Sequence, residues 1–369
     1  MRIALLITSL GVAGAERLVV DLADRFASLG HQVLVVYLTG SAEVLPVHPD
    51  VTVLGAGMTR SPVSVLKSLL AVRRAIRAFR PDVVNSHLVH ASLVARLLRL
   101  TMRTPRLVSS AHNMDEGGGR GRMLAYRMSD WLVDISTNVS DEAVAAFVAR
   151  GAVKPGRMVT MHNGIDVEKF RFMPQARDDL RKTLGCAEGK KLLLAVGRFH
   201  ELKDYPNLIR AFAQARLRRP GIQLVIAGDG LLRTELEAMM ESLGVADDVH
   251  LLGVRHDVPE LMSACDIFVL SSASEGFGLV VAEAMACGRV VVATDCGGVR
   301  EVVGNEGLLV PPQDSEKLAS AIVAAVDLDP AAAAAMALRA RQRVEALYSL
   351  DRAAQKWLAL YDAVYAHAA

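Results

Sequence analysis

Two glutamates eight positions apart, Glu275 and Glu283, bracket a short segment rich in small residues. The apolar run over 267–270 predicts a buried strand just before the segment, and residues 279–285 predict a helix just after it. One acid therefore lies in a strand-to-helix loop and the other on the helix. Two carboxylates in these positions suit a ligand that presents hydroxyl groups on both sides of a central anion.

The loop between the glutamates has the features of a phosphate site. The first backbone N–H groups of a helix have no helical partners, and they point at anions bound to the helix start. Glycine leaves room for a ligand to approach the backbone because it has no Cβ. The residues expected at this position are Gly276, Phe277, Gly278 and Leu279. A phosphate flanked by acids indicates a nucleoside-diphosphate sugar.

Two cations follow the first strand of the second half of the chain. Arg198 and Lys203 come just after the apolar run 192–196. Open α/β sheets bind ligands at the carboxyl ends of their strands, so this pair can converge on a diphosphate. Arg grips phosphate with two N–H groups, whereas Lys acts as a point charge. The structural alternative is a pair of solvated loop charges.

Short apolar strands that alternate with amphipathic helices must position these residues, and this alternation predicts parallel sheets with right-handed crossovers. The expected strands lie near 2–8, 33–38, 51–54, 83–86, 106–110, 133–137, 192–196, 223–227, 249–252, 267–270, 290–294 and 307–310. The expected helices lie near 16–29, 63–79, 90–100, 141–150, 205–218, 231–243, 258–264, 279–287, 315–326 and 351–366, with a further alanine-rich helix from 331.

Length and composition describe an ordinary globular α/β protein. The chain has 369 residues, more than one hydrophobic core comfortably holds, so we expect two domains, 1–167 and 168–350, followed by a terminal helix, 351–369. It holds 52% hydrophobic and 22% charged residues, and no apolar run approaches the ~18 residues that span a bilayer. Its four cysteines show no C-x-x-C spacing, which favours a reducing cytoplasm over disulfides or zinc.

A series of further short motifs accompanies the two glutamates in order along the chain. They are the glycine loop 11–17, His112 after an apolar strand, Asn163 to Asp166, Gly228 to Gly230, Gly253 after the strand near 251, and Gly297 to Glu301. Together with the E-x7-E spacing of Glu275 and Glu283, this series resembles retaining glycosyltransferases of the family-4-like group, which have the GT-B fold. One departure is His162, which stands where a proline is usual before Asn163.

The resemblance implies two Rossmann-like parallel-sheet domains facing across a cleft, with the C-terminal helix crossing back to the first. It assigns Arg198 and Lys203 to the departing diphosphate, Glu283 to the ribose hydroxyls, and Glu275 and His112 to the donor sugar. The same resemblance implies that the loop of Gly14 lets backbone N–H groups face the donor diphosphate and the acceptor. It also implies that Gly253 and Val254 contact the base. It implies no metal and no cofactor beyond the donor, a UDP-sugar or GDP-sugar. The structural alternatives are a helix-dipole partner for Glu283, a helix cap for Glu275, a packed ring for His112 and a tight turn at Gly14.

The first half of the chain also carries a basic amphipathic segment. Residues 60–127 hold 13 lysines and arginines against 3 acids. Within 63–79 apolar residues recur at helical spacing, and Arg96, Arg99, Arg103 and Arg106 follow. A basic amphipathic helix can lie on an anionic membrane, so 63–106 is a candidate for peripheral membrane contact. A Rossmann helix with a solvated face explains the pattern equally well, and the scarcity of aromatic residues disfavours nucleic acid.

These features predict a transferase that moves a hexosyl or N-acetylhexosaminyl group from a nucleotide sugar to a hydroxyl acceptor with retention. A basic face fits a lipid-linked acceptor in cell-envelope glycan, lipopolysaccharide or glycolipid synthesis, at the inner face of the membrane. Two alternatives stay open. One is a sugar-nucleotide epimerase or a phosphorylase of the same fold, although neither the acid–base pair of the first nor the pyridoxal-phosphate lysine of the second is evident here. The other is a non-catalytic sensor or partner subunit that binds nucleotide sugars.

Overall fold

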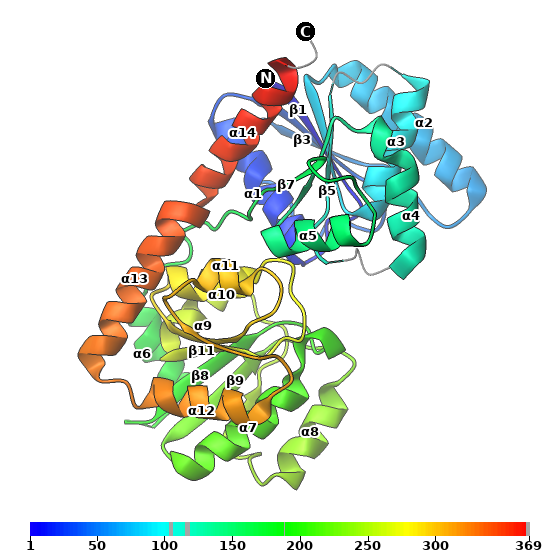
Figure 1. Cartoon of the computed structure of the whole chain (residues 1–369). Coiled ribbons are helices and arrows are strands. Elements are labelled where there is room, and N and C mark those ends of the chain that lie inside the picture. The colour runs from blue at the N-terminus through cyan, green and yellow to red at the C-terminus, as the bar shows by residue number, and fades with distance from the viewer. Residues whose placement is uncertain (103–105, 115–118, 188, 367–369) are drawn as a thin grey trace. The chain divides into compact units, whose positions relative to one another are not determined.

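The computed structural model describes residues 1–102, 106–114, 119–187 and 189–366, and the chain divides into two compact units. Unit 1 is Met1–Gly164 with the C-terminal segment from Leu350, and unit 2 is Ile165–Ser349. Each unit is a parallel sheet between helices (Figure 1). The two Rossmann-like parallel-sheet domains expected from the alternation of strands and helices are therefore confirmed.

Seven parallel strands form the sheet of unit 1, in the order β3-β2-β1-β4-β5-β6-β7. The strands are β1 (Arg2–Ile7), β2 (Gln32–Tyr37), β3 (Val51–Gly55), β4 (Val83–His87), β5 (Leu107–Ser110), β6 (Ile135–Asn138) and β7 (Met158–Thr160). The helices are α1 (Gly14–Ser28), α2 (Pro62–Phe79), α3 (Val89–Thr101), α4 (Gly119–Ser129), η1 (Asp130–Leu132), α5 (Asp141–Ala149) and α14 (Leu350–Ala366).

Alternating residues of β1 fill the two faces of this sheet. Ile3 and Leu5 pack with α1 and with Trp357 and Tyr361 of α14, while Leu6 packs with α2 and α3 on the other face. Because side chains of a strand alternate between faces, a strand buried on both sides is apolar throughout. Figure 1 shows α14 beside α1, so the last helix of the chain completes one layer of unit 1.

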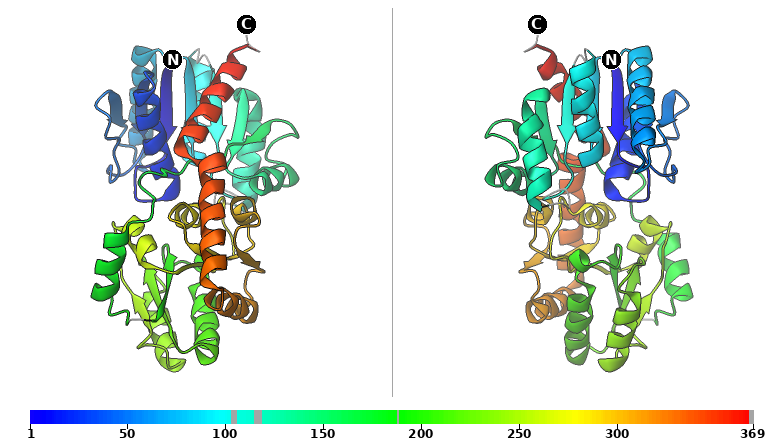
Figure 2. Two further views of the ribbon diagram at one scale, coloured as in Figure 1. Left: turned by 90° about the vertical axis from the view of Figure 1, so that its left-hand side faces the viewer. Right: turned by 90° about the vertical axis from the view of Figure 1, so that its right-hand side faces the viewer.

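Unit 2 is built on a sheet of six parallel strands, ordered β10-β9-β8-β11-β12-β13. The strands are β8 (Lys191–Val196), β9 (Ile222–Ala227), β10 (Val249–Leu251), β11 (Ile267–Leu270), β12 (Val290–Thr294) and β13 (Leu308–Val310). The helices are α6 (Pro174–Thr183), η2 (Glu201–Lys203), α7 (Tyr205–Arg218), α8 (Arg233–Ser242), α9 (Val258–Ala264), α10 (Leu279–Ala286), α11 (Val299–Val303), α12 (Ser315–Val326) and α13 (Pro330–Tyr348). Figure 2 shows this unit from two sides, with helices covering the strands.

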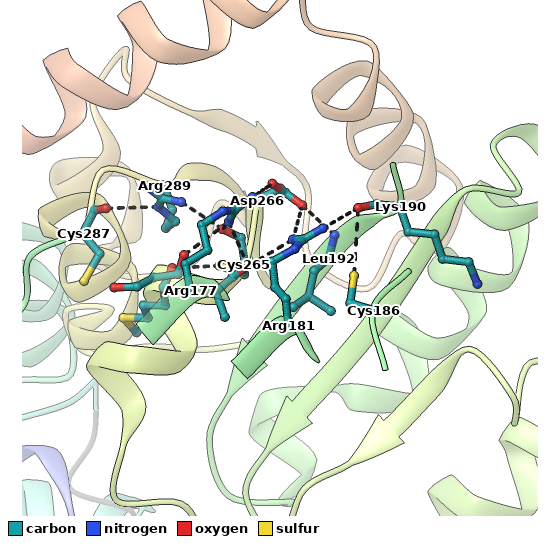
Figure 3. A network of polar contacts seen from close by, with 12 residues as sticks. Arg177, Arg181, Cys186, Lys190, Leu192, Cys265, Asp266, Cys287 and Arg289 are labelled. Carbon is teal, nitrogen blue, oxygen red and sulfur yellow. Dashed lines mark hydrogen bonds and ion pairs between the residues drawn. The ribbon is translucent and has the colours of Figure 1, made fainter. Parts of the chain in front are cut away.

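An ion-pair network fastens α6 to the sheet of unit 2 (Figure 3). Arg177 and Arg181 both bind the carboxylate of Asp266, at 2.6 and 3.0 Å, and that carboxylate also accepts the N–H of Leu192 at 2.8 Å. Burial by itself raises the pKa of Asp266, but the Leu192 N–H and the two arginines outweigh it, and the pKa is lowered. This carboxylate joins the start of β8, the start of β11 and α6.

Among the described residues, three α-helices are missing from the sequence-based expectation, as are the short 3-10 helices η1 and η2. The segment of α4 contains Gly119 and Gly121, which weaken a helical pattern, and α6 buries no residue and so shows no apolar stripe. The third, α11, has only five residues. Among the described residues no single helix is long and apolar enough to cross a bilayer, and only α12 with α13, bent by 110°, pass such a test when joined.

Candidate active site

The strand order of unit 2 reverses direction between β8 and β11, which are neighbours in the sheet. Chain connections leave this point toward opposite edges, so the loops after β8 and β11 diverge. Ligands of open α/β sheets bind in the crevice that such a reversal leaves at the carboxyl ends of the strands. The loop after β8 carries Arg198 and Lys203, and the loop after β11 carries Glu275. Three predicted residues therefore lie on the two loops at this point.

Lys203 and Glu275 form an ion pair at the reversal. The ammonium Nζ of Lys203 lies 2.6 Å from Oε1 of Glu275, and the two side chains are 26% and 13% exposed. The hydroxyl of Ser272 donates to the same carboxylate oxygen at 2.7 Å, and the hydroxyl of Ser271 donates to the Lys203 carbonyl at 2.8 Å. The ion pair thus joins residues 72 positions apart, and the two serines that follow β11 bond to both of them.

Arg198 occupies the same loop as Lys203 but in a different environment. Its side chain is exposed, and within the described ranges its guanidinium forms no hydrogen bond or ion pair. The next residue, Phe199, is buried and packs against Tyr205, whose hydroxyl donates to the Gly197 carbonyl at 3.0 Å. Burial raises the pKa of Tyr205, and the charge of Glu275 adds to this rise. The loop thus presents an exposed cation above the buried contact of Phe199 with Tyr205.

The loop between the two glutamates ends on α10, as predicted. Gly278 caps this helix with a left-handed φ of 88°, a conformation that favours glycine. Gly276, Phe277 and Leu279 complete the turn, and α10 begins at Leu279. Glu283 is half-buried on the helix, one turn after its start.

A second glycine, from the next loop of the sheet, fixes the backbone of Glu275. Gly297 follows β12 with φ 55°, and a Cβ at this position would lie 1.7 Å from the Glu275 carbonyl oxygen. No side chain larger than hydrogen fits there without moving Glu275. Gly297 belongs to the motif series, and the structure explains why glycine is needed there: a larger residue would displace the candidate residue Glu275.

The residues expected at the base lie after β10, at the same edge of the sheet. The carbonyl of Gly253 accepts the Gly228 N–H at 2.8 Å, and the side chain of Val254 is 65% exposed. Beyond them Arg255 forms a two-pronged ion pair with Asp257, and the hydrogen bond from Arg255 lowers the pKa of Asp257. The loop therefore offers a carbonyl, an apolar side chain and an ion pair.

Unit 1 holds the other two predicted residues, His112 and Gly14. Gly14 is the first residue of α1, and the Glu16 carboxylate near it accepts a hydrogen bond from Ser9 at 3.0 Å. His112 follows β5, and its Nε2 lies 3.0 Å from Nδ1 of His87, the last residue of β4. Burial lowers the pKa of His112 to about 4.

Four residues of these arrangements were not predicted as site residues. Ser272 binds the Glu275 carboxylate, and Tyr205 binds the Gly197 carbonyl beneath the loop of Arg198. Gly297 adjoins the Glu275 backbone, and His87 contacts His112. Ser272 lies three residues before Glu275 in the same loop, so its proximity to Glu275 could be inferred from the sequence. No sequence signal points to His87, because its contact with His112 depends on β4 lying next to β5. Among the described residues no group of three or more metal-binding side chains is close enough to hold an ion.

Comparison with known proteins agrees with this geometry. Residues 176–343 match the family described as glycosyl transferases group 1, and residues 12–169 match glycosyltransferase family 4. A D-inositol 3-phosphate glycosyltransferase of Mycobacterium marinum is 31% identical over 81% of this chain and 68% of its own. The chain belongs to the group 1 glycosyltransferases. An alpha-maltose-1-phosphate synthase of Mycolicibacterium smegmatis is 28% identical over 86% of this glycosyltransferase and 87% of its own length.

Solved structures are similar to the glycosyltransferase over nearly its whole length. HepE of Anabaena, in a crystal with UDP and glucose, is 25% identical with a TM-score of 0.85 and covers 98% of this chain and 99% of its own. HepE has also been crystallised with UDP-glucose. A sucrose-phosphate synthase from Thermosynechococcus elongatus, 23% identical with a TM-score of 0.85, covers 100% of both chains and shows the fold. These likenesses confirm the GT-B fold.

Proposed function

We propose that this glycosyltransferase moves a hexosyl or N-acetylhexosaminyl group from a nucleoside-diphosphate sugar to a hydroxyl acceptor, with retention and without a metal. The observation that carries the proposal is the Lys203–Glu275 ion pair at the strand reversal of unit 2, beside the start of α10. Cations and helix N–H groups bind phosphates, and a carboxylate binds sugar hydroxyls. The presence of UDP-glucose in the related HepE supports a nucleotide-sugar donor, a UDP-sugar in the first instance and a GDP-sugar in the second.

Each residue then has a task that its position allows. Arg198 is exposed and has no partner among the described residues, so it can move onto the diphosphate. Lys203 binds a phosphate oxygen through an ammonium N–H that does not point at Glu275. The N–H groups at the start of α10 face the same anion. Glu283 accepts from the ribose hydroxyls, and Glu275 from hydroxyls of the donor sugar.

The reaction needs no acid–base pair of the protein. The bond between the anomeric carbon and the diphosphate oxygen breaks, and a bond to the acceptor oxygen forms on the same face of the sugar. The departing phosphate oxygen takes the proton that the acceptor hydroxyl loses. Arg198 and Lys203 stabilise the charge that develops on this leaving group, which is the kind of electrostatic assistance that a metal ion provides elsewhere.

Release of nucleoside diphosphate from a panel of UDP-, GDP- and ADP-sugars tests this proposal, with and without a bacterial lipid extract. We expect release from one donor, stimulated by the extract, and an α product from an α donor in the NMR spectrum. Glu275→Gln should lower turnover about 10²–10³-fold, the range for loss of a group that acts on the transition state. The control is Glu241→Gln, which makes the same carboxylate-to-amide change at an exposed residue of unit 2. An epimerised donor, or tight binding without release, would support one of the two rival functions.

We also propose that the acceptor is lipid-linked, in cell-envelope glycan, lipopolysaccharide or glycolipid synthesis, and that unit 1 contacts the membrane. The exposed side of α2 carries apolar Val63, Leu66 and Leu70 together with Lys67 and Arg74. The helices α2, α3 and α4 contain no acid, and α3 contacts both of its neighbours. Apolar side chains surrounded by cations suit an anionic lipid surface.

The structure places the arginines beyond α2 differently from the sequence-based expectation. Arg96 is buried and donates to the Tyr126 carbonyl, Arg106 is buried, and Arg99 binds Asp134 through two bonds. Arg103 lies outside the described residues. These internal roles remove Arg96, Arg99 and Arg106 from the proposed basic face, and among the described residues of 63–106 the exposed charges lie on α2 and its C-terminal cap.

Flotation with vesicles that contain phosphatidylglycerol tests the membrane contact. Binding at low salt, weakened at high salt and in Lys67→Glu with Arg74→Glu, is expected because lipid charge is screened by salt. The control is Lys182→Glu with Lys356→Glu, which makes the same charge change at exposed sites elsewhere. No binding of wild type at low salt, or equal loss in the control, would refute the contact and leave the transfer reaction untouched.

A further inference from the structure

The outer surface of α4 and η1 carries a row of exposed apolar side chains. Leu124, Met128 and Trp131 follow one another at spacings of four and three residues, and each is between 57% and 71% exposed. Met123 and Tyr126 of the same helix are buried. Because residues three and four apart are neighbours on a helix surface, the three exposed side chains form one apolar surface, here called the α4 stripe.

Contacts on the inner side of α4 hold this helix in place. The ring of Tyr126 stands edge-on to Phe147 of α5, with 5.7 Å between centroids. The buried guanidinium of Arg96, on α3, donates to the Tyr126 carbonyl at 3.1 Å and to the Ser129 hydroxyl at 2.8 Å. The α4 stripe is therefore presented by a helix that is fixed from behind by packing and hydrogen bonds.

Exposed apolar side chains continue from the α4 stripe onto the neighbouring helices. α3 contacts both α4 and α2, and the three helices lie on one side of the unit 1 sheet (Figure 1). Scattered exposed apolar residues are normal, whereas contiguous apolar patches mark interaction sites. Eight large apolar side chains are exposed on these helices and η1, namely Val63, Leu66, Leu70, Leu97, Leu100, Leu124, Met128 and Trp131.

The charges beside the α4 stripe are positive. Arg120 and Arg127 of α4 are exposed, and each lies one helical turn from a member of the stripe. The acid next to Trp131, Asp130, is buried and binds Arg157 at 3.3 Å. An apolar surface flanked by cations is complementary to an anionic bilayer, which attracts the arginines and takes up the apolar side chains.

Trp131 has the properties of a residue at the boundary between lipid headgroups and hydrocarbon. Its indole N–H donates to the Met128 carbonyl at 3.2 Å. This carbonyl lies in the last turn of α4, where carbonyls have no helical partner. The bond satisfies both groups, and it therefore lowers the cost of moving them out of water. Tryptophan is enriched at membrane interfaces because its large apolar ring has one polar edge.

We propose that the α4 stripe inserts into the interfacial region of an anionic bilayer and anchors unit 1 there. This inference rests on the proposed function, in which a lipid-linked acceptor brings the protein to a membrane. It adds a second kind of contact to the one proposed for α2. Attraction between the α2 cations and lipid charge is screened by salt, whereas burial of the apolar stripe does not depend on charge.

The fluorescence of Trp131 tests the insertion directly. The chain has two tryptophans, and because Trp357 is buried, a change of emission on vesicles reports on Trp131. Vesicles that contain phosphatidylglycerol should shift the emission to shorter wavelength, and lipids brominated on their acyl chains should quench it. Flotation of the protein with vesicles but without shift or quenching would overturn the insertion and leave the α2 contact standing. No flotation of wild type at low salt would overturn both contacts and leave the transfer reaction untouched.

A pair of substitutions tests whether the stripe contributes to affinity. Leu124→Ser with Met128→Ser keeps Trp131 as the reporter and should weaken binding to the vesicles about 10–100-fold, because two large apolar side chains no longer leave water. The control is Leu217→Ser with Leu338→Ser, which removes exposed apolar side chains from unit 2 and should bind like wild type. All four side chains are exposed, so both variants should fold.

Salt separates the stripe from the cations of α2. At high salt some binding of wild type should remain, and the stripe variant should lose it. Equal binding of the stripe variant and the control would overturn the proposal. An emission shift that grows with protein concentration in the absence of vesicles would show that a second copy of the chain covers the stripe, and it would also overturn the proposal.

Discussion

The Lys203–Glu275 ion pair makes a prediction in which binding and turnover move in opposite directions. The Lys203 ammonium pairs with the Glu275 carboxylate at 2.6 Å. A diphosphate that binds Lys203 must therefore accept a carboxylate as its near neighbour. Glu275→Gln removes that negative charge and should strengthen the binding of nucleoside diphosphate while lowering turnover. Lys203→Met should weaken the binding.

The magnitudes follow from the geometry of the pair. A phosphate oxygen bonded to Lys203 lies within about 5–6 Å of the Glu275 carboxylate, because two hydrogen bonds of ~3 Å share one nitrogen. The Lys203 side chain is about one quarter exposed, so the site is partly screened by water. At this distance the repulsion between the phosphate and the Glu275 carboxylate is about 1 kcal/mol, or roughly fivefold in Kd. Loss of the charge-assisted bond in Lys203→Met costs about 1.5–3 kcal/mol, roughly 10–150-fold in Kd.

Isothermal titration calorimetry with UDP, and with GDP if UDP does not bind, measures these changes. The double variant Lys203→Met with Glu275→Gln completes a thermodynamic cycle, and residues in contact should give a coupling of about 0.5 kcal/mol or more. Glu241→Gln is the control for loss of an acid from the surface of unit 2. Weaker binding in Glu275→Gln, or additive effects in the cycle, would refute the idea that this carboxylate competes with the diphosphate.

Three further substitutions test how the site is supported. Gly297→Ala should destabilise the protein and lower turnover, because the new Cβ collides with the Glu275 carbonyl. The control is Gly244→Ala, where φ is 63° and no atom lies near the new Cβ. In urea unfolding this control should cost only the ~1–2 kcal/mol of a left-handed non-glycine residue. Equal losses would contradict the collision. Asp266 has a lowered pKa in the folded state, so its contribution is present above the unfolded value of about 4 and is lost as the pH falls through the folded pKa. Asp266→Asn should therefore be less stable at pH 7 and lose less melting temperature between pH 5 and 3 than wild type, and parallel curves would contradict this. Asp329→Ala, which removes the cap of α13, should cost about 1 kcal/mol of unfolding free energy in urea, and no change would contradict the capping role.

The fold could be predicted largely from the sequence because both sheets are parallel and buried. Buried parallel strands are continuous apolar runs, and the predicted strand 267–270 coincides with β11, while 205–218 coincides with α7. The missed helix α6 shows where this reasoning fails. It buries no residue and is held by Arg177 and Arg181, which reach Asp266 far along the chain. Apolar periodicity carries no signal for a helix that is fixed by ion pairs.

Candidate site residues could be selected from the sequence, but the residues that contact them could not. Glu275, Lys203 and His112 could be recognised as polar residues that follow apolar strands. That Lys203 pairs with Glu275 depends on β8 lying next to β11, although β9 and β10 come between them in sequence. In the same way His87 belongs with His112 only because β4 lies next to β5.

The strand order explains why both units place their candidate residues at one kind of position. In unit 1 the order reverses between β1 and β4, so the loop that leads to Gly14 and the end of β4 at His87 flank the reversal. In unit 2 it reverses between β8 and β11, and Lys203 and Glu275 flank it. At such a reversal the loops after two neighbouring strands run to opposite sides of the sheet. The space between them leaves backbone and side chains accessible to a ligand without breaking the sheet. Substitutions at these two positions should therefore affect turnover more than stability, whereas those at Asp266, at the opposite ends of the strands, should affect stability first.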